Sequence, residues 1–293
     1  MKIIGHKKNW VLLENLIKTG KFSHAYLFCG QENLGKKTVA VEFLKLAFGE
    51  DLFCHPDFIF VEPAESEIQI SQIRDLNWKL SLKPFSAPFK AAIIDNAHLM
   101  NTEAQNCFLK TLEEPKGNTI LILVTDFPEA LLPTIKSRVQ KIKFFPVEKK
   151  EIENYLRGKG LAEKEVNIIS EVSMGRPGSA INLLSDPEKL GKFKKKIKEI
   201  TEILDSDLAF RFRYAKELAD SGNVRETLNI WLGYFRNILL SNMKLKKNWV
   251  ILRKTYTFEK LKNILKNIQT TIFLTSTTNI NPRLALEVLM MDL

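Results

Sequence analysis

The chain has 293 residues, of which 45% are hydrophobic, and a net charge of +10 at pH 7. This length suggests two or three domains, and no apolar stretch approaches the length of a membrane span. The first residues lack the pattern of a signal peptide, and the three cysteines fall singly, which argues against a disulfide framework. We therefore expect a globular protein of the reducing cytoplasm. Its charge suits an acidic partner such as nucleic acid, or equally a lysine-rich solvated surface.

The first half of the chain, residues 1–146, alternates short apolar runs with helical patterns. This alternation predicts an α/β fold with a mostly parallel sheet. The expected strands are residues 25–29, 57–61, 91–95, 119–125 and 140–144.

A glycine-bounded loop, residues 30–38 (GQENLGKKT), lies between the first strand and a helical pattern over 39–47. Strand, loop and helix are the context of a phosphate-binding loop (P-loop), because amides at a helix N-terminus can point at phosphate. Gly30 and Gly35 bound the loop, and Lys36 stands where a P-loop lysine reaches the outer phosphates. We expect a nucleotide site here.

The residue after Lys36 departs from this pattern. A P-loop enzyme carries a Ser or Thr hydroxyl there to bind Mg²⁺, and this chain carries Lys37, whose ammonium repels a divalent cation. Thr38 comes one residue late, and one helical step turns a side chain by about 100°. The sequence therefore predicts a nucleotide site with a damaged metal position.

A second acidic motif follows the third expected strand, which ends in Asp95. P-loop enzymes hold the water shell of the metal with such a carboxylate. In hydrolytic members the next residue is usually Glu, which polarises the attacking water, whereas here it is Asn96, whose amide cannot accept a proton. Alone, Asp95 could cap a turn; together with the loop it favours a nucleotide site that lacks its general base.

Residues 101–115 predict a helix with Ala104, Phe108 and Leu112 on one stripe. Either Asn101 or Thr102 caps it, and Pro115 stops it. The strand over 119–125 then ends in a hydroxyl and a carboxylate, and a helix is expected over 131–138.

After Pro146 the pattern becomes helical throughout. We expect short helices over 149–159, 163–173 and 179–184, and longer ones around 208–219, 224–240, 258–271 and 281–293. The predicted domains are 1–146, 147–186 and 187–293. A basic run at 192–198 could lie along DNA or form the solvated face of a helix, and the solvated face is the commoner case.

Several phrases identify a family. They are SHAYLFCG at 23–30, HPDF at 55–58, AQNCFLKTLEEP at 104–115, LLPTIKSR at 131–138 and NINPRLALEVLMMDL at 279–293. The chain resembles the clamp-loader branch of the AAA+ ATPases over nearly its whole length. This resemblance implies an α/β P-loop (AAA+) domain, a three-helix lid domain and an all-α collar domain through which subunits assemble.

The resemblance also implies roles for single residues. Arg138, in the Ser-Arg motif, would project into the ATP site of an adjacent subunit, where a guanidinium stabilises charge on the γ-phosphate. The alternative is an ordinary helix-terminal arginine that counters the helix dipole. Thr125 would occupy the first sensor position. The arginine of the second sensor is replaced by Ser179.

No zinc or other metal is expected. Many bacterial relatives carry a four-cysteine zinc module before the HPD segment, but this chain retains only Cys54 there. His55 could add one ligand, and two ligands do not make a structural zinc site.

The resemblance implies a subunit with little or no hydrolysis of its own, in which ATP or ADP binds weakly at most. Its partners would be related subunits in a hetero-oligomeric ring, a sliding clamp and primer-template DNA, without a membrane, at the replisome of the cytoplasm. Two alternatives remain open: a hydrolysing motor subunit of the same family, and, more distantly, a P-loop kinase or transferase.

Overall fold

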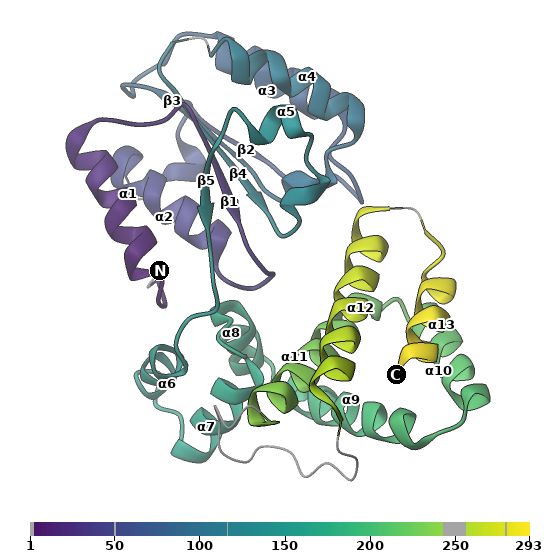
Figure 1. The fold of residues 1–293 in the computed structure, drawn as a ribbon. Coiled ribbons are helices and arrows are strands. Elements are labelled where there is room, and N and C mark those ends of the chain that lie inside the picture. Colours follow the sequence, from purple (N-terminus) through teal and green to yellow (C-terminus); the bar gives the residue numbers. More distant parts are fainter. Residues whose placement is uncertain (1–2, 50, 116, 243–255, 279) are drawn as a thin grey trace. The chain divides into compact units, whose positions relative to one another are not determined.

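The computed structural model describes residues 3–49, 51–115, 117–242, 256–278 and 280–293 (Figure 1). The chain forms two compact units, residues 1–184 and 185–293, and each is described by itself. Among the described residues no helix is long and apolar enough to cross a membrane.

The first unit is built on a parallel sheet with the strand order β2-β3-β4-β1-β5. The strands are β1 (Ala25–Cys29), β2 (Phe58–Val61), β3 (Lys90–Ile94), β4 (Thr119–Thr125) and β5 (Gln140–Lys143). Four of them read as continuous apolar runs because helices cover both faces of a parallel sheet. Since β1 lies between β4 and β5, the crevice at its carboxyl end is where open α/β sheets bind ligands.

Helices cover both faces of this sheet, as Figure 1 shows. On one face, α1 (Lys7–Thr19) and α2 (Lys36–Phe48) bury residues such as Leu13 and Phe43 against β1 and β4. On the other face lie α3 (Ile70–Ser81), α4 (Thr102–Glu113) and the short α5 (Pro133–Lys136). The stripe predicted for α4 is confirmed, because Ala104, Phe108 and Leu112 are all buried there. Asn101, rather than Thr102, is its N-cap and accepts a hydrogen bond from the amide of Ala104 at 2.8 Å.

The predicted helix over 131–138 is wrong in extent, since α5 spans only Pro133–Lys136. Proline is favoured in the first turn of a helix, so α5 begins at Pro133. Ser137 and Arg138 form the turn that closes the helix, with the Ser137 amide donating to the carbonyl of Pro133 at 3.0 Å. Single-turn helices η1 (Leu52–Cys54), η2 (Ala97–Leu99) and η3 (Pro128–Ala130) complete this part.

The lid helices also belong to the first unit. They are α6 (Lys149–Arg157), α7 (Glu163–Val172) and α8 (Pro177–Ser185). Their small apolar core includes Ile152, Val166 and Ile169, and it takes in Ile4 from the start of the chain. The N-terminal segment thus contacts the lid as well as the sheet domain.

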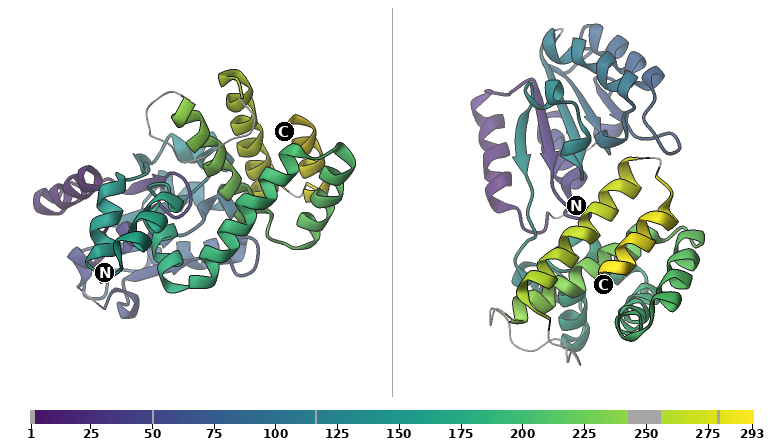
Figure 2. Two further views of the ribbon diagram at one scale, coloured as in Figure 1. Left: turned by 90° about the horizontal axis from the view of Figure 1, so that it is seen from below. Right: turned by 45° about the vertical axis from the view of Figure 1, so that its right-hand side comes forward.

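The second unit is all-α (Figures 1 and 2). Its helices are α9 (Pro187–Asp205), α10 (Leu208–Asp220), α11 (Val224–Asn242), α12 (Phe258–Thr277) and α13 (Pro282–Asp292). Trp231 and Phe235 of α11 and Ile268 of α12 are fully buried, and α11 packs against α12. α12 runs beyond its predicted end, and residue 279, the first of the closing phrase, lies outside the described residues.

The basic run at 192–198 lies on α9. Lys192, Lys195 and Lys198 are exposed, and Lys196 pairs with Glu199 on its own helix at 2.9 Å. These side chains fit the solvated face of a helix.

Candidate functional site

The P-loop leaves the carboxyl end of β1 and enters α2. Its backbone needs left-handed conformations at Asn33 (φ 62°) and Gly35 (φ 85°), and Gly35 caps α2. A Cβ at Gly30 would lie 2.4 Å from the carbonyl oxygen of Phe144, which directly follows the neighbouring strand β5. The loop thus retains the glycines that its path along the sheet requires.

Lys36 is buried, and its ammonium is bound within the chain. Nζ donates to the carbonyl oxygens of Gly30 at 2.8 Å and Gln31 at 2.7 Å, and to Oδ1 of Asp126 at 2.8 Å. An ammonium has three N–H donors, so these three acceptors satisfy it completely. A phosphate that reached Lys36 would have to displace at least one of them.

Lys37 lies over the carboxyl ends of β2 and β3. Its Nζ is 3.0 Å from Oδ2 of Asp95 and 3.6 Å from Oε2 of Glu62, and 4.6 Å from the ring centroid of Phe60. The second oxygen of Asp95, Oδ1, accepts a hydrogen bond from the amide of Asn96 at 3.0 Å. Both oxygens of the strand-end carboxylate are therefore engaged by the protein.

Asn96 adopts a left-handed conformation (φ 51°, ψ 45°). Asparagine tolerates this region better than most residues with a Cβ. The local backbone thus gives a conformational reason for Asn at the position where hydrolytic relatives carry Glu.

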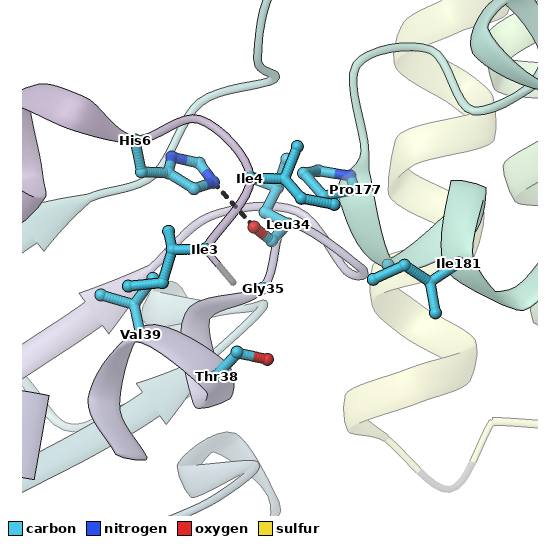
Figure 3. A pocket seen from close by; sticks show the side chains of 10 residues that line it. Ile3, Ile4, His6, Leu34, Gly35, Thr38, Val39, Pro177 and Ile181 are labelled. Carbon is cyan, nitrogen blue, oxygen red and sulfur yellow. Dashed lines mark hydrogen bonds between the residues drawn. The ribbon is translucent and has the colours of Figure 1, made fainter. Parts of the chain in front are cut away.

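The lid helix α8 contacts the P-loop directly. The amide of Gly178 donates to the carbonyl oxygen of Asn33 at 2.8 Å, and a Cβ at Gly178 would lie 2.9 Å from that oxygen. A cavity of about 40 Å³ remains between the N-terminal segment, the start of α2 and α8, and Thr38 lines it (Figure 3). A buried water needs roughly 10–15 Å³ by this measure, so the space suits a few waters and not a nucleotide base.

His6 closes the same cavity from the N-terminal side (Figure 3). Burial lowers its pKa below 6.5, although the carbonyl of Leu34 opposes this shift. The ring is therefore neutral at pH 7, and its Nε2 lies 2.7 Å from the Leu34 carbonyl oxygen, to which it can donate. His6 ties the start of the chain to the P-loop.

A P-loop of this class implies a nucleotide with Mg²⁺, and the residues fit this group poorly. The glycines would allow a phosphate to approach, but Asp126 and two carbonyls hold Lys36, and an ammonium pairs with Asp95. The described residues contain no cluster of three or more His, Cys, Asp or Glu side chains that could hold a metal.

Thr125 lies at the end of β4 and is buried. Its Oγ1 accepts a hydrogen bond from the amide of Phe127 at 3.0 Å and is 3.2 Å from Nδ1 of His98. The next residue, Asp126, holds Lys36. The sequence marked a hydroxyl and a carboxylate at this strand end, but it gave no sign that the carboxylate binds the P-loop lysine.

The remaining sequence candidates are Ser179, Cys54 and His55. Ser179 is in the first turn of α8, and Arg176 precedes that helix, with Nε 3.4 Å from the carbonyl of Ser173. Cys54 is exposed, and Nδ1 of His55 accepts from the amide of Asp57 at 3.1 Å.

Arg138 is partly exposed and held by its neighbours. Its Nη2 is 2.8 Å from Oε1 of Glu113, the first glutamate of the KTLEEP phrase. Nη1 donates to the carbonyl of Thr134 at 3.0 Å, and 37% of the side chain remains exposed. The KTLEEP phrase and the Ser-Arg motif thus meet in one ion pair at the surface.

Arg138 lies at the amino-terminal ends of the strands, and the P-loop lies at their carboxyl ends. It precedes β5, whose first residue, Gln140, pairs with Tyr26 near the start of β1, whereas Gly30 follows the end of β1. Four residues of strand span roughly 13 Å. The topology therefore separates this arginine from the loop of its own chain.

Gln105 is a site residue that sequence reasoning passed over. It is 5% exposed, its Nε2 donates to the carbonyls of Met100 at 3.1 Å and Ala130 at 3.3 Å, and its Oε1 accepts from the amide of Leu132 at 2.8 Å. It joins α4 to the segment that leads into α5 and Arg138. The signal in the sequence was an amide beside the buried stripe of Ala104 and Phe108.

We predict that Gln105→Leu lowers the free energy of unfolding by about 2–3 kcal/mol, because it leaves a buried amide and two carbonyls without partners. Urea unfolding followed by far-UV circular dichroism measures this loss. Asn106→Ala, on the exposed side of α4, is the control and should change stability by less than about 0.5 kcal/mol. An equal effect of both variants would contradict the bridging role of Gln105.

This chain is similar to known proteins in sequence and in fold. A family model described as "DNA polymerase III, delta subunit" matches residues 5–148. The gamma subunit of DNA polymerase III from Buchnera aphidicola (subsp. Schizaphis graminum) is 30% identical over 69% of this chain and 62% of its own. The delta' subunit from Bacillus subtilis is 28% identical over 70% of this chain and 67% of its own.

The chain is related to the clamp-loader subunits of the AAA+ proteins. A solved structure supports the fold: a DNA polymerase III gamma subunit-related protein from Thermotoga maritima aligns over 95% of this chain and 97% of its own, with 21% identity and a TM-score of 0.51. The delta' subunit from Pseudomonas aeruginosa is 36% identical, over 40% of this chain and 41% of its own. The sequence matches span between 41% and 67% of the length of the three DNA polymerase III subunits. These similarities confirm the resemblance, and the parallel sheet with its covering helices confirms the expected fold class.

Proposed function

We propose that this clamp-loader protein is a delta'-like subunit of bacterial DNA polymerase III. It assembles with related subunits of the gamma/tau and delta types, and it donates Arg138 to the ATP site of a neighbour. The observation that carries this proposal is the placement of Arg138, which is partly exposed, held by Glu113, and on the sheet edge opposite its own P-loop.

The electrostatics of a transferring phosphoryl group explain what such an arginine does. Negative charge spreads over the γ-phosphate oxygens in the transition state, and a planar guanidinium can bind two of them at once. Glu113 and the carbonyl of Thr134 hold the guanidinium through Nη2 and Nη1. In an assembly the arginine would exchange this partner for the phosphate of the adjacent subunit.

The loop of this chain argues for a subunit with little hydrolysis of its own. Lys37 replaces the metal-binding hydroxyl, Asn96 replaces the general base, and Ser179 replaces the arginine of the second sensor. Any ATP or ADP would bind weakly, through Gly35, Lys36 and the loop amides, because it must compete with Asp126 for Lys36. A hydrolysing gamma-type subunit is the second candidate, favoured by the similarity to gamma subunits, but it would need the first two of these groups.

The purified chain alone should therefore hydrolyse ATP no faster than a buffer blank. A phosphate-release assay with and without Mg²⁺ measures this rate, and Lys36→Ala is the check on contamination. A rate that disappears in Lys36→Ala would mean that the chain has its own active site, and the gamma-type function would then be favoured.

The remaining partners follow from the same proposal. The sliding clamp and primer-template DNA would be bound within the assembly, in the cytoplasm at the replisome. Contacts of lysines and arginines with phosphates would make DNA binding fall steeply with salt.

A further inference from the structure

Lys37 occupies a fixed place between two strand ends. Glu62 and Asp95 follow the parallel neighbours β2 and β3, and the amide of Asp95 donates to the carbonyl of Val61 at 2.9 Å, which keeps the two ends in register. The ammonium reaches both carboxylates from the first turn of α2. The ring of Phe60, on β2, lies beneath it at 4.6 Å from the centroid, in the range of a cation–π contact.

These contacts distinguish Lys37 from an ordinary surface lysine. An exposed ion pair with one partner contributes little, because two long side chains must be ordered and water screens the charges. Here one ammonium meets two carboxylates and an aromatic face, and the carboxylate nearest to it is only 12% exposed. The charge of Asp95 is thus compensated from within the chain.

A divalent cation could not share this position. A Mg²⁺ held by Asp95, whether through its water shell or directly at about 2.1 Å, would lie close to the ammonium that already stands 3.0 Å from Oδ2. Two cations so close to the same carboxylate oxygen would repel each other strongly. The other oxygen of Asp95 accepts the amide of Asn96.

We propose that the Lys37 ammonium is a built-in replacement for the divalent cation of this P-loop, so that the loop has no divalent-metal site, with or without nucleotide. The lysine does more than remove a metal ligand: it supplies positive charge at the place where the metal would supply it. This proposal concerns the chain by itself and does not depend on its assembly with other subunits.

The test is equilibrium dialysis of the full chain against Mn²⁺, alone and with ATP, and the quantity measured is Mn²⁺ bound per chain. The native protein should bind no Mn²⁺ that depends on Asp95. Lys37→Thr, which restores a hydroxyl and removes the ammonium, should bind one Mn²⁺ in the presence of ATP at least about tenfold more tightly than the native chain. Lys37→Thr combined with Asp95→Asn should lose this site.

Lys45→Thr is the matched control, since it removes the same charge from the same helix at a lysine paired with Glu42, and it should gain no site. Lys37→Gln serves as a second variant if Lys37→Thr does not fold, as judged by circular dichroism, and should bind Mn²⁺ more tightly than the native chain. One Mn²⁺ per native chain that disappears in Asp95→Asn would overturn the proposal. A folded Lys37 variant that binds Mn²⁺ no better than the native chain would also overturn it.

Discussion

An assembly reconstituted with Arg138→Ala should lose about 10³-fold of the turnover at the one ATP site that receives this arginine. The loss arises because alanine cannot place positive charge against the γ-phosphate in the transition state. Nucleotide binding at that site should change far less, since the charge matters most in the transition state. The measurement is DNA-stimulated ATP hydrolysis by the assembly with its partner ATPase, the clamp and primed DNA.

Two further variants sharpen this prediction. Arg138→Lys should recover little activity, because an ammonium lacks the planar pair of donors that binds two oxygens. Lys136→Ala, two residues away and paired with Glu129, removes the same charge and should leave hydrolysis unchanged. Equal rates for the native assembly and the Arg138→Ala assembly would contradict a role in trans.

Asp57→Ala should lower the free energy of unfolding by about 3–5 kcal/mol, the largest stability effect that we expect. Asp57, in the HPDF phrase, is 1% exposed. Its two oxygens accept hydrogen bonds from the amides of Phe85 at 2.7 Å, Ser86 at 2.9 Å and Ala87 at 3.0 Å. The substitution leaves these N–H groups without their partner and releases the loop before β3.

The pH dependence gives this prediction a second readout. Burial alone would raise the pKa of Asp57, but the three amide hydrogen bonds outweigh it and lower the pKa below 3.8. The unfolded chain then binds the proton more readily, so the stabilisation is complete above about pH 5 and is lost as the pH falls towards the folded-state pKa. The difference in unfolding free energy between the native chain and Asp57→Ala should therefore shrink below about pH 4.

Urea unfolding at a series of pH values between 3 and 7 measures this difference. Asp51→Ala is the control, because Asp51 is exposed and makes no side-chain cap hydrogen bond. A constant difference across this range would contradict the hydrogen-bonded carboxylate as its cause.

The elements of this fold were predictable where local pattern decides them. Strands β1 and β4 lie where apolar runs predicted them, because both faces of a parallel sheet are buried and the runs stay apolar. The P-loop was predictable because its glycines are needed by the backbone path beside Phe144. Helices α1 and α3 were not anticipated, and both carry many exposed polar residues between their buried positions.

The partners of the functional side chains could not be predicted, because they come from distant parts of the chain. Asp126 holds Lys36 across 90 residues, and Glu113 holds Arg138 across the whole of β4. Lys37 was predicted to repel a metal, and only the packing of β2 beside β3 places its ammonium between two carboxylates. A sequence pattern identifies such residues, whereas the topology of the sheet decides which of them meet.

The central claim is that this chain works in the site of a neighbour and not in its own. The most direct test is steady-state ATP hydrolysis, measured for this chain alone and for a gamma-type partner alone. The third sample is the complex of the two with a delta-type subunit, isolated by size-exclusion chromatography. The account predicts no hydrolysis by this chain alone, and in the complex a DNA-stimulated rate above that of the partner. Hydrolysis by the isolated chain, or a partner whose rate does not change when this chain joins it, would contradict the account.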